Sequence, residues 1–408
     1  MATDRRDRAL LAGVVFTVLF AQVALYPDIP ALVSALGGTP ASWGGNVDAV
    51  LSAGKWFLTA EFLGFVLFAG LWGAASDAAG RRRRFVVAGA VLGAAGYLAV
   101  ALVPALGLPY AAVLGLRFLQ GAATIGAFSL AVTTLMDLPG GHGRNMGAAG
   151  IAIGAGTALG APVGGQLYAL GPFVPLYAAS ALLVVAAGVA ALVEERAPES
   201  DRGGLRAAVG VLRERPALGV PFAFGFVDRL TAGFFALVGT VYFRSELGLD
   251  AAGTGLLLGA FFAPFALLQY PFGRLSDRVG RVLPVAAGSL LYGVAIVCVF
   301  LAPSVPLTAA VMVLVGVLGA LVAPATMALV TDLAGDARGT AMGGFNVFGS
   351  LGFLAGVVGG ATVAAGQGFG AAFLAVGLSE VAIAVLALPA LLRLGSGSAP
   401  AKGEREKV

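Results

Sequence analysis

The hydrophobic positions of this chain fall into long apolar runs separated by short polar or charged loops. A helix needs about 20 mostly apolar residues to cross a bilayer, and each run meets that length. The pattern predicts twelve membrane-spanning helices, six in each half of the chain. Their expected positions are residues 8–27, 50–72, 85–104, 109–135, 146–169, 173–193, 217–242, 253–272, 283–302, 307–330, 340–364 and 370–392.

A segment rich in charge, proline and glycine separates the two sets of six runs. This segment, residues 194–215, has a composition typical of a linker. We therefore expect a first bundle over residues 1–195, a linker over 196–215 and a second bundle over 216–408. Within the linker, Leu205–Leu212 is expected to form a short amphipathic helix.

Positive charge gathers on one side of the predicted helices. With the N-terminus placed in the cytoplasm, 21 of the 25 Lys and Arg residues fall in cytoplasmic segments. The positive-inside rule then predicts a multi-pass protein of the cell membrane with both termini in the cytoplasm. The other four are Lys55, Arg117, Arg229 and Arg244. Lys55 and Arg244 lie near the outer ends, where we expect them to reach the membrane interface.

Composition excludes several classes of protein. The chain is 59% hydrophobic and 11% charged, whereas a water-soluble domain has roughly 25% charged residues. One cysteine, Cys298, excludes an intrachain disulfide, and one histidine, His142, argues against a His-based metal site. A Gly-x-x-x-x-Gly-Lys phosphate loop, a Ser/His/Asp set and a metal cluster are all missing from the sequence. We therefore expect neither an ATP-driven pump nor an enzyme, with no metal or cofactor.

A charged loop occurs twice, about 200 residues apart. It follows the second and the eighth apolar runs and keeps the spacing of its Gly, Asp and Arg residues. Such an internal repeat at half-chain distance is typical of secondary transporters. The repeated positions are Gly73, Asp77, Gly80 and Arg81 in the first copy, and Gly273, Asp277, Arg278, Gly280 and Arg281 in the second.

With this doubled loop motif the chain resembles the major facilitator superfamily over essentially its whole length. Arg117, Gln120 and Gly121 also resemble the Arg-x-x-Gln-Gly motif of proton-coupled members. The fifth helix resembles the Gly/Pro-rich motif of the twelve-helix drug:proton antiporters, where the glycines favour close packing and the proline a bend. Its motif residues are Gly156, Gly160, Pro162 and Gly164.

The resemblance implies an all-α membrane protein that works by alternating access. Two pseudo-symmetric six-helix bundles would surround a central cavity. Asp77 and Asp277 would accept hydrogen bonds at helix N-termini, and the arginines of the loops would pair with carboxylates such as Asp137 or Asp332. These contacts would latch the cytoplasmic side in the outward-facing state. The alternative is that the loop arginines serve only to fix topology.

Several charges lie inside the predicted helices, where a charge costs roughly 2.5–3.5 kcal/mol and is therefore paired or functional. We favour Glu61 and Asp228 as proton-titrating or cation-binding carboxylates, with Arg117 close enough to tune such a group. Asp228 and Arg229 point about 100° apart, so each is expected to have a partner on another helix. The alternative is a structural set of ion pairs. For Glu380 we expect a packing or dimer contact.

The residues expected to face the central cavity carry few hydrogen-bonding groups and several aromatic rings. This lining suits a hydrophobic or amphipathic solute better than a sugar. The candidates are Gln22, Tyr26, Gln120, Phe234, Phe235, Gln269, Tyr270 and Asn346.

The leading hypothesis is therefore proton-coupled export of such small molecules, as in multidrug-type efflux. The alternative is proton-coupled uptake of a small organic anion or metabolite, with Arg117 or Arg229 as its partner. A non-transporting membrane receptor is the third hypothesis. The expected partners are the substrate, protons and lipid, with no nucleic acid, and the expected state is a monomer.

Overall fold

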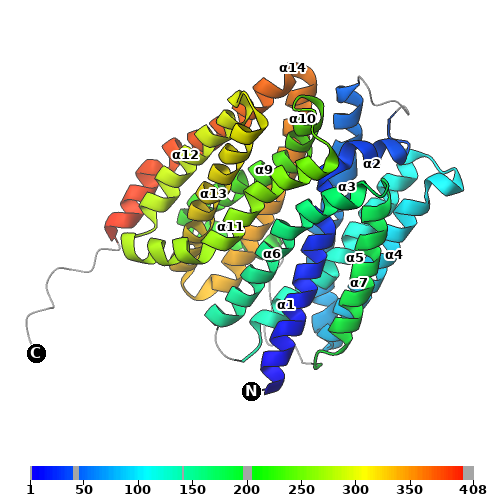
Figure 1. Cartoon of the computed structure of the whole chain (residues 1–408). Helices are drawn as coiled ribbons and strands as arrows, with labels where there is room; N and C mark the ends of the chain where they lie inside the picture. Colours follow the sequence, from blue (N-terminus) through cyan, green and yellow to red (C-terminus); the bar gives the residue numbers. More distant parts are fainter. Residues whose placement is uncertain (1, 40–45, 140–141, 196–204, 398–408) are drawn as a thin grey trace, which may run out of the picture.

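The first half of the chain forms six long helices (Figure 1). The computed structural model describes residues 2–39, 46–139, 142–195 and 205–397. The first crossing combines three consecutive pieces: α1 (Ala2–Val23), the 3-10 turn η1 (Tyr26–Asp28) and α2 (Ile29–Ala35). The others are α3 (Val47–Ala79), α4 (Arg82–Leu102), α5 (Tyr110–Met136), α6 (His142–Tyr168) and α7 (Val174–Ala191), with the turn η2 (Pro104–Leu106) after α4.

The second half repeats this order after the short helix α8 (Leu205–Glu214), which lies where the sequence predicts a linker helix. Its first crossing again has three pieces: α9 (Gly219–Phe234), the π-helical η4 (Phe235–Gly239) and α10 (Thr240–Ser245). The rest are α11 (Ala251–Val279), α12 (Val282–Leu301), α13 (Val305–Ala334) and α14 (Arg338–Gly397), with the short turns η3 (Pro216–Leu218) and η5 (Gly335–Ala337).

The last element, α14, comprises two crossings. Its apolar stretch of 55 residues far exceeds the roughly 20 that one crossing needs. Gly368 interrupts it with φ 85° and ψ 169°, a backbone conformation that favours glycine. With this division the described residues form twelve apolar crossings, as the hydrophobic pattern predicts. The structure is therefore that of a multi-pass membrane protein.

The crossings form two groups that lie side by side in Figure 1. In the first group α3 and α4 pack on α5, while α6 and α7 pack on α1. In the second, α9 packs on α14, and α11 and α12 pack on α13. The groups meet where α6 packs on α11 and α3 packs on α14. Part of the predicted linker, residues 196–204, lies outside the described residues, so the domain boundaries stay a prediction.

Glycines bring helix backbones into contact at matching places in the two groups. A methyl group added at Gly164 of α6 would lie 2.1 Å from the Ala24 carbonyl oxygen at the end of the first helix. A methyl group added at Gly352 of α14 would lie 1.9 Å from the Phe226 carbonyl oxygen of α9. Small residues allow this approach in a bilayer. Gly156 and Gly160 contact α1 in the same way, and Pro162 lies within α6.

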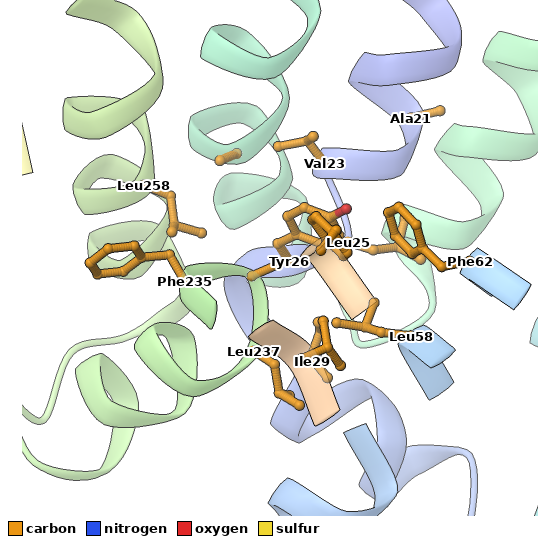
Figure 2. Close-up of a cluster of buried hydrophobic side chains, with 14 of the residues drawn as sticks. Ala21, Val23, Leu25, Tyr26, Ile29, Leu58, Phe62, Phe235, Leu237 and Leu258 are labelled. Carbon is orange, nitrogen blue, oxygen red and sulfur yellow. The ribbon is translucent and has the colours of Figure 1, made fainter. Parts of the chain in front are cut away.

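The two groups close against each other at the end that carries Asp28. There Asp28 Oδ2 lies 3.1 Å from Arg244 Nη2, so Arg244 pairs across the groups instead of reaching the membrane interface as predicted. The Phe62 and Phe353 rings stack 3.9 Å apart. Both rings belong to a buried apolar cluster with members from both groups, part of which is shown in Figure 2. It includes Tyr26, Ile29, Leu58 and Phe62 of the first group and Phe235, Leu237 and Leu258 of the second.

The groups separate toward the opposite end, which carries the N-terminus and the doubled loop (Figure 1). The α6–α11 contact extends to Gly154, where an added methyl group would lie 2.8 Å from Ala266 Cβ. Beyond it, the backbone has open space beside Gly147 and Gly150 of α6. The same holds for Gly70 and Gly73 of α3. We call the closed end the Asp28 end and the other the loop-motif end.

Asp28→Asn is expected to weaken closure of the Asp28 end. The amide keeps the cap on Ala31 N but loses the charge-assisted bond to Arg244, worth about 1.5–3 kcal/mol. In a Cys298→Ser background, maleimide labelling of Leu237→Cys should rise on the order of tenfold. Asp48→Asn, which alters an exposed carboxylate at the start of α3, is the matched control. Equal labelling in the two variants would contradict closure by this ion pair.

Candidate functional site

A buried ion pair joins α3 and α5 in the first group. Arg117 Nη2 donates a hydrogen bond to Glu61 Oε2 over 2.5 Å, and neither side chain is exposed. The structure thus brings together two residues that the sequence identifies separately as charges inside helices. A pair of opposite charges offsets part of the cost of burying each one, so it is tolerated where a lone charge is not.

The ion pair is part of a longer polar network. Arg117 Nη1 donates to Gln120 Oε1 over 2.5 Å, and Gln120 Nε2 donates to Thr124 Oγ1 over 2.7 Å. The Phe57 and Tyr97 rings lie 4.6 and 5.2 Å from the guanidinium carbon. Aromatic faces attract a cation, most strongly where water is absent. Arg117 is therefore held on several sides.

Some polar atoms of this network are buried without a hydrogen-bond partner among the described residues. They are Glu61 Oε1, Arg117 Nε and Tyr97 Oη. A buried polar atom without a partner is costly, and in a native structure it calls for an explanation such as a functional role. Glu61 therefore has one carboxylate oxygen engaged by Arg117 and one that is available to accept a proton.

The ion pair depends on a close approach of α3 and α5. A methyl group added at Gly121 would lie 2.3 Å from the Glu61 carbonyl oxygen. One added at Gly64 would lie 2.5 Å from the Phe118 carbonyl oxygen. The last residue of the Arg-x-x-Gln-Gly motif thus sets the distance across which its arginine reaches Glu61.

The second group holds its buried charge in a different way. Glu380 is 1% exposed and accepts hydrogen bonds from Ser289 Oγ over 2.6 Å and Thr231 Oγ1 over 3.3 Å. Asp228 lies one turn before Thr231 and is half-buried, while Arg229 is exposed with its stem against Gly349. None of these is joined by a described contact to Glu61 or Arg117.

Each copy of the doubled loop contains an arginine that lies between two carboxylates of the same group of helices. In the first copy Arg82 bonds both Asp77 and Asp137, while Arg81, the residue expected from the motif, is exposed at the start of α4. In the second copy Arg281 lies 2.5 Å from Asp277 and 3.2 Å from Asp332.

The arginine is shifted by one position because the two turns differ. Gly80 has φ 63° and ψ 25°, and Gly280 has φ 86° and ψ 164°. Both conformations favour glycine, but they direct the following residues differently. The spacing of the motif predicts Arg81, whereas the turn at Gly80 places Arg82 over the carboxylates. Arg278 of the second copy is exposed.

Arg281 lies outside the apolar spans and is partly exposed. Burial alone would lower the pKa of its guanidinium, but the hydrogen bonds and charges of Asp277 and Asp332 outweigh burial and raise that pKa above its usual value. Arg281 therefore stays charged, and its ion pairs persist over the range of pH in which the carboxylates are ionised.

The predicted cavity residues divide by exposure. Gln22, Tyr26, Phe234 and Phe235 are buried at or near the closed Asp28 end, where Phe234 and Phe235 pack with Phe373, and Gln120 belongs to the Arg117 network. In this conformation they pack against protein. Gln269 is half-buried, Asn346 and Tyr270 are exposed, and Gly273 is half-buried on α11.

No group of three His, Cys, Asp or Glu side chains suited to a metal occurs in the described residues.

Comparison with known proteins identifies the family. The sequence profile described as Major Facilitator Superfamily matches residues 11–242 and 222–407, nearly the whole chain. The chain belongs to the Major Facilitator Superfamily. It is therefore a transporter of that family.

A curated relative and several solved structures are similar to this superfamily member. Tetracycline resistance protein, class G, of Vibrio anguillarum is 31% identical over 242 residues, which cover 56% of this chain and 58% of the relative. The chain thus spans less than two thirds of that relative's length.

The solved structures show the same fold. The human organic anion transporter MFSD10 (TETRAN) is 22% identical with a TM-score of 0.69, covering 94% of this chain and 99% of that one. An inward-facing bacterial homolog to the human lysosomal transporter Spinster is 13% identical with a TM-score of 0.74, covering 95% and 98%. The nucleoside transporter NupG is 13% identical with a TM-score of 0.71, covering 94% and 99%.

Gly121→Ala is expected to force α3 away from α5 and stretch the Glu61–Arg117 ion pair. Overpacking of this kind costs about 1–3 kcal/mol, so the thermal unfolding midpoint of the purified protein should fall. Gly115→Ala is the matched control, because Gly115 lies on the same helix with open space beside it. If the two variants unfold at the same temperature, the close approach does not hold this site together.

Proposed function

We propose that this protein exports hydrophobic or amphipathic small molecules in exchange for protons by alternating access. The observation that carries the proposal is the buried Glu61–Arg117 ion pair, whose carboxylate keeps one oxygen without a hydrogen-bond partner in the described structure. A proton on Glu61 would neutralise the carboxylate and leave the Arg117 charge buried without its counterion. Loading and releasing that proton therefore changes the free energy of the α3–α5 contact.

The chemistry of the surrounding side chains favours a lipophilic substrate. The Phe57 and Tyr97 rings lie against the Arg117 guanidinium, and the buried apolar cluster around them includes Tyr26 and Phe62. A tetracycline resistance protein is a curated relative with sequence similarity to this chain. Both points support export of lipophilic compounds over transport of a sugar.

A second candidate function is uptake of a small organic anion. It is favoured by the exposed guanidinium of Arg229 on α9, a position within an apolar span. The similarity to a solved organic anion transporter supports only a shared fold, because the two sequences are 22% identical.

We further propose a place and an orientation in the cell. The chain would lie in the plasma membrane as a monomer, with the loop-motif end and both termini in the cytoplasm. The support is the charge distribution, since 21 of 25 basic residues then lie on the cytoplasmic side. The present conformation, closed at the Asp28 end, would then be the inward-facing one.

Transport into everted membrane vesicles tests the function. With an imposed pH gradient, acidic inside, vesicles that contain the protein should accumulate tetracycline or a lipophilic dye, and collapse of the gradient should release it. Uptake of an organic anion by intact cells, with no effect on tetracycline or the dye, would contradict export and support the second candidate.

Glu61→Gln is expected to abolish the dependence of efflux on the pH gradient while substrate still binds. The amide keeps a hydrogen bond to Arg117 and the shape of the side chain but carries no exchangeable acid. Driven efflux should fall to the level of empty vesicles, whereas substrate-for-substrate exchange should continue. Glu246→Gln, at an exposed position, is the control. An unchanged pH dependence would exclude Glu61 as the coupling group.

Asp77→Asn is expected to impair transport without loss of folding or membrane insertion. It removes one of the two carboxylates that hold Arg82, while Asp137 remains as its partner. The measurement is efflux per unit of protein in the membrane, with Asp48→Asn as the control. Efflux at the wild-type rate would mean that the loop serves topology alone.

A further inference from the structure

The second group of helices contains a buried carboxylate with no cation against it. Glu380 lies on the second crossing of α14 and contacts α9 through Thr231 and α12 through Ser289. No basic side chain pairs with it among the described residues. Burying an ionised carboxylate without a counterion is far more costly than burying the neutral acid.

The hydrogen bonds around Glu380 suit a carboxylic acid. Ser289 Oγ donates to Oε2 over 2.6 Å. Thr231 Oγ1 lies 3.3 Å from Oε1 and 3.4 Å from the Val227 carbonyl oxygen. A hydroxyl donates one hydrogen bond and accepts others. When Glu380 takes up a proton on Oε1, Thr231 can turn its own hydroxyl proton to the Val227 carbonyl oxygen and accept the bond from Glu380 instead of donating one.

A second observation points into the same site. Tyr292 of α12 is 1% exposed, and its Oη has no hydrogen-bond partner among the described residues. Tyr292 lies one turn after Ser289, and a methyl group added at the next residue, Gly293, would lie 2.9 Å from Glu380 Cβ. The site thus retains an unused polar group beside the carboxylate.

Other titratable groups near Glu380 come from few elements. Asp228 and Arg229 are on α9, where Asp228 lies three residues before Thr231, the residue that bonds Glu380. Along α12, Cys298 lies nine residues beyond Ser289, about 14 Å away. The membrane-spanning parts of α13 and of the first crossing of α14 carry no titratable side chain near this depth. Asp228 is the half-buried carboxylate of this set, whereas Glu380 is buried.

We propose that Glu380, Thr231 and Ser289 form a proton-binding site in the second group of helices, which exchanges its proton through Asp228. The proton adds to Glu380 Oε1 as the acid forms, and it leaves to the Asp228 carboxylate. The site is separate from the Glu61–Arg117 ion pair and would give the transporter a proton in each half. This deepens the proposed proton coupling of the protein.

Infrared spectroscopy of the purified protein tests the site without measuring transport. The wild type at neutral pH should show the C=O stretch of a protonated carboxyl group, and Glu380→Gln should lose that band. Ser289→Ala should keep the band but shift it to higher frequency, because the carbonyl oxygen loses its donor. The matched controls are Glu246→Gln, at an exposed position, and Ser379→Ala, at a half-buried position whose hydroxyl donates to the Ala375 carbonyl oxygen of its own helix. A wild type without the band, or a band that remains in Glu380→Gln, would overturn the proposal.

The route through Asp228 has its own readout. In heavy water the carboxyl band shifts as deuterium replaces the proton, and Asp228→Asn should slow that shift while the band itself remains. Exchange at the wild-type rate would overturn the role of Asp228.

Replacing potassium by sodium should leave the band unchanged. Its loss in sodium would assign the site to a metal cation instead. Since none of these measurements needs a substrate, failure of drug export and failure of this site are distinguishable.

Discussion

Contact between helix backbones at glycine is the constraint on which the rest of this structure depends. Apolar helices in lipid gain little from hiding apolar surface from one another, so their packing relies on close approach. Gly121 against Glu61, Gly164 against Ala24 and Gly352 against Phe226 provide that approach. These contacts fix the spacing between helices. The spacing in turn decides which polar side chains meet inside the bundle.

The two halves share one architecture but solve the problem of a buried acid differently. In the first half, Glu61 is neutralised by Arg117, and aromatic rings shield the pair. In the second, Glu380 has hydroxyl groups as neighbours in place of a cation. The two halves therefore share a fold but differ in how their buried carboxylates are stabilised. Movement of one half against the other would change the surroundings of two chemically different acids.

The sequence predicts the twelve crossings, the duplicated loop and the family, because hydrophobic length and turn residues are local properties. It also identifies Glu61 and Arg117, since a charge inside an apolar run is visible without a structure. It does not reveal Arg82, because the choice between adjacent arginines depends on the backbone angles at Gly80. The Asp28–Arg244 contact and the hydroxyl groups at Glu380 depend on which side of each helix faces a neighbour. Depth along a helix follows from the sequence, but that facing direction does not.

The closing segments of the Asp28 end follow interruptions in their helices. Between α1 and α2 lies the 3-10 turn η1, and between α9 and α10 lies the π-helical η4. Such interruptions leave backbone hydrogen bonds weaker than in an unbroken α-helix and are places where helices bend. Asp28 lies at the end of the first interruption, and Arg244 lies five residues after the second. The short segments α2 and α10 can therefore bend apart at these interruptions, while the glycine-packed parts of α1 and α9 keep their positions.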